Sequence, residues 1–250
     1  MARQCIFCNR SADSLEHFWA EWLLERINLR ELISISFGNA ARKFLDNPKL
    51  RIRSVCKICN NGWMSQLESQ NIPLIGSLAQ NVLIPLDTRQ QTSIALWATK
   101  TAMVLDSIRR RAERRFYRRR ECEQLHQNSL IPELTFIWLG MYAENSLGLF
   151  GTDIRLFDQI PEVFPTIGHG CVNTIVAGHL AIQVLTIHLL PEYRDHPIEV
   201  GPNAGDWSRL TLGIWPIEKS TAWPPSTPFT GSGPHSIGQF VNRWKRRKSA

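Results

Sequence analysis

Four cysteines in the first 60 residues form two pairs with the spacing Cys-x-x-Cys, Cys5 with Cys8 and Cys56 with Cys59. Two thiols at this spacing can turn toward one ion, and two such pairs supply the tetrahedral sulfur ligands that structural Zn²⁺ prefers. Two disulfides are the alternative, but Cys-x-x-Cys loops are tight and the N-terminal residues lack an apolar export signal. We therefore expect the four cysteines to bind a structural zinc ion.

Three residues near these pairs have side chains suited to phosphodiester hydrolysis. That reaction needs a base that takes a proton from water, and a divalent cation held by oxygen ligands. Imidazole side chains ionise near neutral pH, so His17 is a suitable residue type for the base. The carboxylate of Glu16 and the amide oxygen of Asn60 suit Mg²⁺ or Mn²⁺. Because Asn60 directly follows Cys59, we expect zinc binding to bring the three side chains together.

In type and order these residues resemble the HNH endonucleases of the ββα-metal type. That family has a Cys-x-x-Cys pair, an acidic residue followed by histidine, and a second Cys-x-x-Cys pair followed at once by His or Asn. The string from Val55 to Met64, VCKICNNGWM, is similar to a bacterial branch commonly labelled HNH endonuclease, and the resemblance ends near residue 70. It implies that His17 is the general base, that Glu16 and Asn60 hold a catalytic Mg²⁺ or Mn²⁺, and that the cysteines hold zinc.

The chain departs from the family pattern at two positions. Members usually carry an asparagine a few residues before the second cysteine pair, where this chain has arginine, isoleucine, arginine and serine at residues 51–54. That asparagine mostly steadies the loop bearing the catalytic histidine. The acidic residue is Glu16 rather than the commoner aspartate. The missing asparagine favours an alternative hypothesis, a non-catalytic zinc-stabilised module that binds DNA or RNA.

Apolar periodicity predicts the elements that position these residues. Residues 18–24 have the spacing of a helix, whereas residues 32–37 and 50–55 alternate as strands do. Asn60 is a candidate cap for a further helix. We therefore expect residues 1–75 to form an HNH-like zinc-binding nuclease domain, a ββα-metal module that resembles a treble clef.

The rest of the chain predicts a second domain, residues 90–250, so that the fold class is α+β. The apolar stripe that begins at Thr92 predicts a long amphipathic helix. Strand-like runs follow at 134–142, 174–188 and 210–215, and residues 223–236 have the composition of a loop. We expect a helix packed with an antiparallel sheet. A further hypothesis places the function here, in an interaction or effector-sensing domain to which the zinc unit is an accessory.

Positive charge predicts an anionic partner. The net charge is +7, and eight arginines are concentrated in twelve residues. They are Arg109, Arg110, Arg111, Arg114, Arg115, Arg118, Arg119 and Arg120. Arginine binds phosphate with two donors, although a run of charge is commonly only a solvated face. Residues 243–248 form a second basic segment. We expect the partner to be nucleic acid, with DNA favoured over RNA.

The chain lacks an uninterrupted apolar run of the length that spans a membrane, about 18 residues. We therefore expect a cytoplasmic protein without a membrane partner. Cys122 and Cys171 have no neighbouring cysteine, so we expect buried thiols. The remaining histidines are expected to be hydrogen-bonded or surface residues without catalytic roles: His126, His169, His179, His188, His196 and His235.

Overall fold

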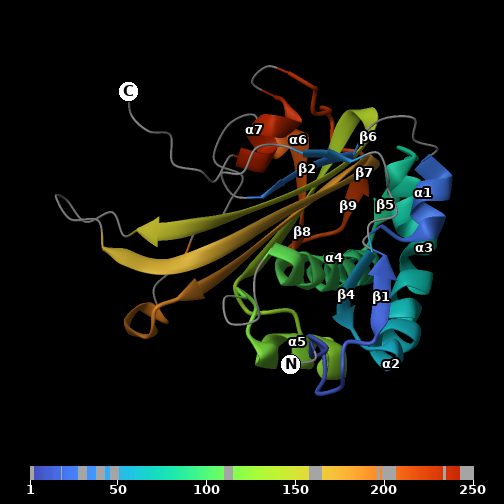
Figure 1. Cartoon of the computed structure of the whole chain (residues 1–250). Coiled ribbons are helices and arrows are strands. Elements are labelled where there is room, and N and C mark those ends of the chain that lie inside the picture. The colour runs from blue at the N-terminus through green and yellow to red at the C-terminus, as the bar shows by residue number, and fades with distance from the viewer. Residues whose placement is uncertain are drawn as a thin grey trace.

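Two long antiparallel strands dominate the central sheet, β6 (Thr135–Phe157) and β7 (Thr166–Leu189). The five-stranded sheet has the order β3-β2-β6-β7, and β8 (Thr211–Trp215) pairs with residues 137–140 of β6, on the edge opposite β7 (Figure 1). The computed structural model describes residues 3–17, 19–27, 33–37, 43–45, 51–109, 115–157, 165–195, 198, 207–232 and 235–242. The predicted α+β class with an antiparallel sheet is confirmed at this level.

The three predicted strands of the second half are present, but two of them are longer than predicted. The runs at 134–142 and 174–188 lie inside β6 and β7, and the run at 210–215 corresponds to β8. Strand β6 continues through residues 143–145, which are exposed, and its register with β7 shifts there. This irregularity interrupts the apolar alternation, which is why the pattern predicts only part of the strand.

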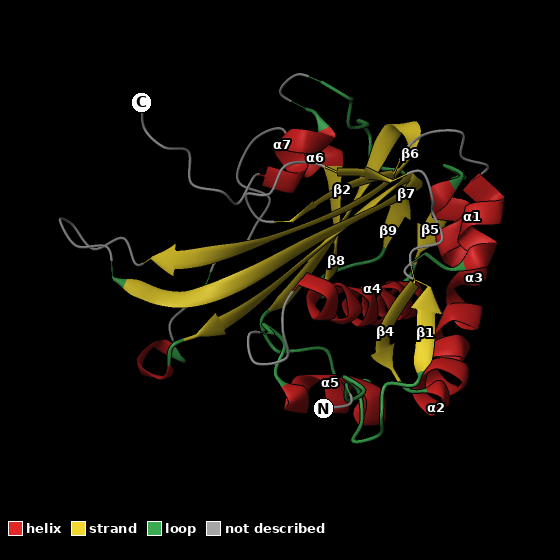
Figure 2. Ribbon diagram, viewed as in Figure 1, coloured by secondary structure: helices red, strands yellow, loops and turns green. Residues whose placement is uncertain are grey.

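Helices cover both faces of the sheet (Figure 2). Along β7, Ile175 and Ala177 belong to the large hydrophobic core that includes α4, whereas Val176 belongs to a smaller core. That smaller core contains Leu210 and Phe240 from the short helices α6 (Trp207–Leu210) and α7 (Ile237–Asn242). Because successive side chains of a strand point to opposite faces, an almost continuously apolar β7 suits a strand buried on both sides.

The N-terminal segment contains the elements that carry the site residues. They are β1 (Ser14–His17), α1 (Glu21–Ile27), β2 (Ile33–Phe37), β3 (Lys43–Leu45), β4 (Arg51–Val55), α2 (Lys57–Cys59), the π-helical turn η1 (Asn60–Met64) and α3 (Ser65–Ala79). The helix predicted after Glu16 and His17 and the strands predicted at 32–37 and 50–55 are confirmed as α1, β2 and β4. Strands β1 and β4 pair antiparallel, and β4 runs directly into Cys56.

The N-terminal segment shares a sheet and a core with the second half. Strand β2 pairs in parallel with β6, with Ser34 opposite Gly148. A single hydrophobic core contains residues from both predicted domains, among them Leu23, Met64 and Leu139. The division into a domain of residues 1–75 and a domain of residues 90–250 stays a prediction.

The predicted amphipathic helix is confirmed as α4 (Thr88–Arg109), with Ile94, Ala98 and Leu105 buried. It begins before Thr92 because Asp87 and Gln90 form a reciprocal cap: Gln90 N donates to Asp87 Oδ1 at 2.7 Å, and Asp87 N donates to Gln90 Oε1 at 2.8 Å. Such a capping box satisfies the first free N–H groups of a helix. Helix α4 packs under the sheet, beside α3 (Figure 1).

The remaining elements are short. They are β5 (Ile84–Leu86), which pairs with β9 (Thr221–Trp223), the helix α5 (Arg119–Asn128) and the 3₁₀ turn η3 (Pro191–Tyr193). The predicted loop at 223–236 follows β9, while the basic segment at 243–248 lies outside the described residues. Within the described part of the chain, every helix is too short or too polar to cross a bilayer.

Candidate functional site

The four predicted zinc ligands lie together. Their Sγ atoms are all within 4.8 Å of one another, and Cys8 Sγ is 3.5 Å from Cys56 Sγ and 3.6 Å from Cys59 Sγ. A tetrahedral site with Zn–S bonds of about 2.3 Å requires sulfur atoms roughly 3.8 Å apart. All four thiols are free of disulfides. The cluster can therefore hold a metal ion and is compatible with structural zinc.

Backbone contacts bring the two cysteine pairs together. Ile6 N donates to Ser54 O at 3.0 Å, so the first pair lies against the end of β4. Lys57 N donates to Asp13 Oδ1 at 2.8 Å, a second link between the loop after Cys8 and the residue after Cys56. Cys56 is the N-cap of α2, and its Sγ accepts a hydrogen bond from Cys59 N. The second pair is thus presented by the start of a helix, where N–H groups face the sulfur atoms.

The thiols differ in acidity. Burial raises the pKa of Cys5 and of Cys59. Burial also acts to raise the pKa of Cys8, but hydrogen bonds from the Arg10 backbone and from Cys56 and Cys59 outweigh it and lower the pKa to about 7. The thiolate is the form that binds metal. Of these three thiols, Cys8 therefore loses its proton at the lowest pH.

Glu16 and Asn60 lie close together, as the sequence predicts. In the β1–β4 pair Ser14 lies opposite Val55 and Glu16 lies opposite Ile52. The register of the two strands shifts between Ser14 and Glu16. Asn60 Nδ2 donates to Ser14 Oγ at 2.8 Å, and Asn60 lies near enough to Glu16 to act to lower the pKa of that carboxyl. The predicted role of Asn60 as an N-cap is wrong, because the helix already begins at Cys56. The amide therefore contacts β1 instead.

His17 contacts a different set of residues. It lies opposite Arg51, whose Nε donates to His17 Nε2 at 2.7 Å. Glu21 Oε1 is 3.6 Å from the same nitrogen, at an ion-pair distance. Among the described residues, the contacts of His17 are made with this pair rather than with Glu16 or Asn60. The structure thus brings two of the three predicted catalytic residues close together and places the third next to one of them in β1.

Two charged residues at the site could not be assigned from the sequence, Lys100 on α4 and Glu68 on α3. Lys100 Nζ is 2.9 Å from Glu68 Oε1 and 3.7 Å from Glu16 Oε1. Glu16 is 6% exposed, and its burial raises its pKa to about 7, with Lys100 opposing the rise and Glu68 adding to it. The only signal in the sequence is a lysine next to the apolar stripe of a predicted helix.

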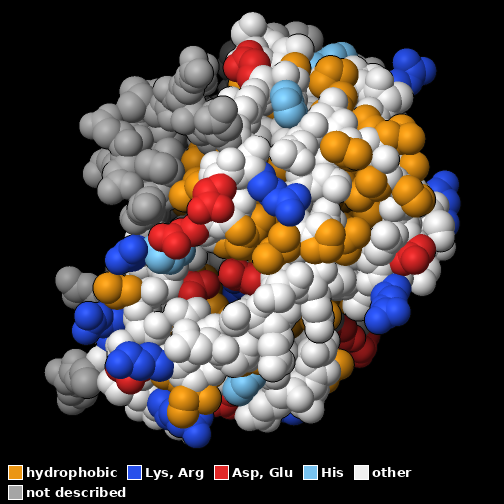
Figure 3. Space-filling model, turned by 90° about the vertical axis from the view of Figure 1, so that its right-hand side faces the viewer, with side chains coloured by type: hydrophobic (Ala, Val, Ile, Leu, Met, Phe, Trp, Pro, Cys, Tyr) orange, Lys and Arg blue, Asp and Glu red, His pale blue; other side chains and the backbone are white. Residues whose placement is uncertain are grey.

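Strand β1 and helices α1 and α3 lie on the side of the molecule at the right of Figure 1. Figure 3 shows this side, with hydrophobic side chains across its middle and several acidic side chains to the left of them.

Arg119 of the arginine run contacts the cysteine loop. Arg119 donates from Nη1 to Gln4 Oε1 at 3.3 Å and also hydrogen-bonds Asn9. Arg118, Arg119 and Arg120 are exposed at the start of α5. Burial lowers the pKa of Arg115, and the positive charge of Arg3 adds to this effect. Positive charge therefore collects beside the cysteine cluster. Arg110, Arg111, Arg114 and the side chain of Arg109 lie outside the described residues.

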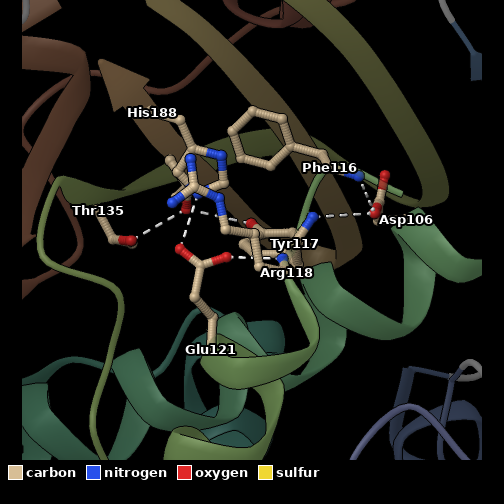
Figure 4. Close-up of polar contacts among 8 residues, drawn as sticks. Asp106, Phe116, Tyr117, Arg118, Glu121, Thr135 and His188 are labelled. Carbon is tan, nitrogen blue, oxygen red and sulfur yellow. Dashed lines mark hydrogen bonds and ion pairs between the residues drawn. The ribbon is translucent and has the colours of Figure 1, made fainter. Parts of the chain in front are cut away.

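A polar network fixes the position of this arginine segment (Figure 4). Asp106 Oδ2 accepts hydrogen bonds from the backbone of Phe116 and Tyr117 at 2.8 and 3.3 Å. Glu121 accepts from Arg118 N at 2.7 Å and contacts His188 Nε2 at 2.7 Å. The ring of His188 stacks on Phe116 with centroids 4.3 Å apart. The segment is thereby bound to both α4 and β7.

Most of the secondary expectations for single residues are met. Cys122 and Cys171 are buried, and burial raises the pKa of Cys122 to about 12, so it stays a thiol. His188 is hydrogen-bonded, as is His179, whose Nδ1 is 2.8 Å from Tyr142 O. His196 lies outside the described residues.

The chain matches no family model, no curated protein and no solved structure. The resemblance to HNH endonucleases therefore depends on the site residues themselves.

Proposed function

We propose that this protein is a metal-dependent HNH-type endonuclease that hydrolyses phosphodiester bonds, with DNA as the favoured substrate. The observation that carries the proposal is that Asn60, beside the cysteine cluster, hydrogen-bonds Ser14 in β1 and so lies close to Glu16. Strands β1 and β4 pair antiparallel and are followed by the helical segment from Lys57, which supports the proposal because a ββα-metal module would need two paired strands and one helix. The cysteines would hold zinc and fix the start of that helix.

The proposed reaction begins at His17. The imidazole accepts a proton from water, the water oxygen bonds to phosphorus, and the bond to the leaving sugar oxygen breaks, after which solvent protonates that oxygen. A ring nitrogen must offer a lone pair for the first step. In this structure Arg51 donates to Nε2, so the neutral ring carries its proton on Nδ1. His17 therefore acts as a base once Arg51 turns away from the ring.

The residues at Glu16 fit a divalent cation. Two carboxylates, Glu16 and Glu68, share one ammonium, that of Lys100, so the buried group carries an excess of negative charge when all three are ionised. Glu16 and the amide oxygen of Asn60 are ligands of the kind that Mg²⁺ and Mn²⁺ take. A bound cation of this kind would stabilise negative charge on the phosphate and the leaving oxygen.

The exposed arginines at the start of α5 would bind the nucleic acid backbone. Arg118 and Arg120 belong to the segment that the polar network attaches to the sheet, so their backbone is ordered before binding. Arginine forks fit phosphate oxygens, and release of counterions makes such binding sensitive to salt.

A second candidate is a zinc-stabilised module that binds nucleic acid without cleaving it. It is favoured by the position of Arg3, Arg115 and Arg119 beside the cysteine loop, which needs no contribution from His17. The bond from Arg51 to His17 is also compatible with a site that does no chemistry.

Incubation of the zinc-loaded protein with supercoiled plasmid and with single-stranded DNA and RNA distinguishes the two candidates. The endonuclease cleaves only when Mg²⁺ or Mn²⁺ is added. Retention of nucleic acid in a binding assay, without cleavage under any metal, would instead establish the binding module.

A further inference from the structure

The Lys100 ammonium lies closer to Glu68 than to Glu16, and this difference affects the charge at Glu16. Lys100 Nζ donates a hydrogen bond to Glu68 Oε1 at 2.9 Å but stays 3.7 Å from Glu16 Oε1. The side chain of Lys100 is 4% exposed and that of Glu16 is 8% exposed. The side chain of Glu68 is 23% exposed. Because the ammonium itself is almost fully buried, it must lie near one carboxylate or the other.

A buried ammonium and a divalent cation compete for the same carboxylate oxygens. Removal of charge from water is costly, so each buried carboxylate binds strongly to whichever cation is within reach. A short bond from Lys100 to Glu16 would occupy the oxygen and cancel the charge that a metal ion needs. In the observed arrangement Glu68 takes the short bond instead.

We propose that Glu68 holds the Lys100 ammonium away from Glu16 and so keeps the Glu16 carboxylate available to the catalytic cation. Lys100 is the built-in competitor of the metal ion, and Glu68 is a positioning residue that acts through Lys100. This inference rests on the proposed endonuclease function, in which Glu16 binds the cation.

Two single substitutions should shift metal affinity in opposite directions. In Glu68→Gln the ammonium loses its charged partner and moves onto Glu16, so binding of Mn²⁺ should weaken by about tenfold. In Lys100→Met the competitor is gone, so binding of Mn²⁺ should strengthen by about tenfold. A purely structural role for the ion pair would weaken binding in both variants.

The double variant Glu68→Gln/Lys100→Met distinguishes an effect of Glu68 through Lys100 from a direct effect of the Glu68 charge on the metal ion. If Glu68 acts through Lys100, the effect of Glu68→Gln should be small once Lys100 has been removed. If Glu68 acts only as a distant negative charge, its loss should weaken Mn²⁺ binding equally with and without Lys100.

The experiment titrates zinc-loaded protein with Mn²⁺ and follows free Mn²⁺ by electron paramagnetic resonance, with zinc content and melting temperature measured for every variant. Opposite shifts and the disappearance of the Glu68→Gln effect in the double variant support the inference. Equal shifts, additive effects, or failure of both the wild type and Lys100→Met to bind Mn²⁺ overturn it.

If Lys100→Met fails to fold, the comparison of Glu68→Gln with Glu68→Asp decides. The aspartate keeps the charge that holds Lys100 and should restore Mn²⁺ affinity, whereas equal weakening in both would contradict the inference. The protein could bind Mn²⁺ as expected and yet cleave no nucleic acid. That result would support the inference about Glu68 and contradict the proposed endonuclease activity.

Discussion

Arg51 lies directly opposite His17 in the β1–β4 pair, and its Nε donates a hydrogen bond of 2.7 Å to His17 Nε2. Arg51 is the first residue of the segment in which HNH endonucleases usually have an asparagine. An asparagine carbonyl can accept a hydrogen bond from the ring, whereas arginine can only donate one. The two side chains would therefore stabilise different tautomers of the histidine.

Substitution Arg51→Asn should raise the cleavage rate severalfold at saturating metal and substrate. The amide oxygen can accept the proton of one ring nitrogen and leave the lone pair of the other free for water. Initial rates of plasmid nicking measure the effect, with Arg53→Asn on the same strand as the control. A large loss of activity in Arg51→Asn would show that Arg51 binds the substrate.

Removal of one cysteine ligand should destabilise the protein strongly. Cys56→Ala deletes both a metal ligand and the N-cap of α2, so the melting temperature should fall by about 10 °C or more and bound zinc should be released. Cys171→Ala is the matched control, because Cys171 is buried but distant in sequence from the cluster, and it should retain zinc. Equal zinc content in Cys56→Ala and the wild type would contradict the assignment of the cluster.

The cluster could be predicted because its ligands come from two short local spacings, and the proximity of Glu16 to Asn60 follows from the position of Asn60 next to Cys59. Glu68 and Lys100 are different, since their meeting depends on how α3 and α4 pack, which no local pattern encodes. The same holds for the parallel pairing of β2 with β6, in which Ser34 meets Gly148 across more than one hundred residues. Long-range pairing of this kind is set by the whole core.

The acidity of Glu16 should make stability depend on pH. Burial raises its pKa from 4.5 to about 7, so the unfolded chain releases this proton more readily than the folded one. The stabilising contribution is therefore complete below pH 4.5 and is lost as pH rises through 7. Without added Mg²⁺ or Mn²⁺, Glu16→Gln should gain about 2 kcal/mol in free energy of unfolding relative to the wild type between pH 5.5 and pH 8.

Urea unfolding of zinc-loaded protein at several pH values measures this difference. The exposed Glu25→Gln serves as the control, and its difference from the wild type should stay nearly constant with pH. A difference between Glu16→Gln and the wild type that is equally independent of pH would contradict the explanation.

The arginines at the start of α5 should contribute to binding by neutralising phosphates. In Arg118→Gln/Arg120→Gln, the dependence of log K on log salt concentration should become less steep by about 0.9 for each duplex DNA phosphate that the variant no longer neutralises. Arg209→Gln is the matched control, because Arg209 is exposed on α6, far from α5 in Figure 1. An unchanged slope in the double variant would place the nucleic acid elsewhere.

Cleavage of supercoiled plasmid by His17→Ala tests the central claim most directly. The variant is compared with the wild type and with His169→Ala, in which an exposed histidine of β7 is removed, at equal concentrations of Mg²⁺ or Mn²⁺. The proposed mechanism predicts that His17→Ala keeps its zinc and its melting temperature but cleaves about 10²- to 10⁴-fold more slowly, while His169→Ala cleaves normally. Cleavage by His17→Ala at the rate of the wild type would contradict the assignment of His17 as the base.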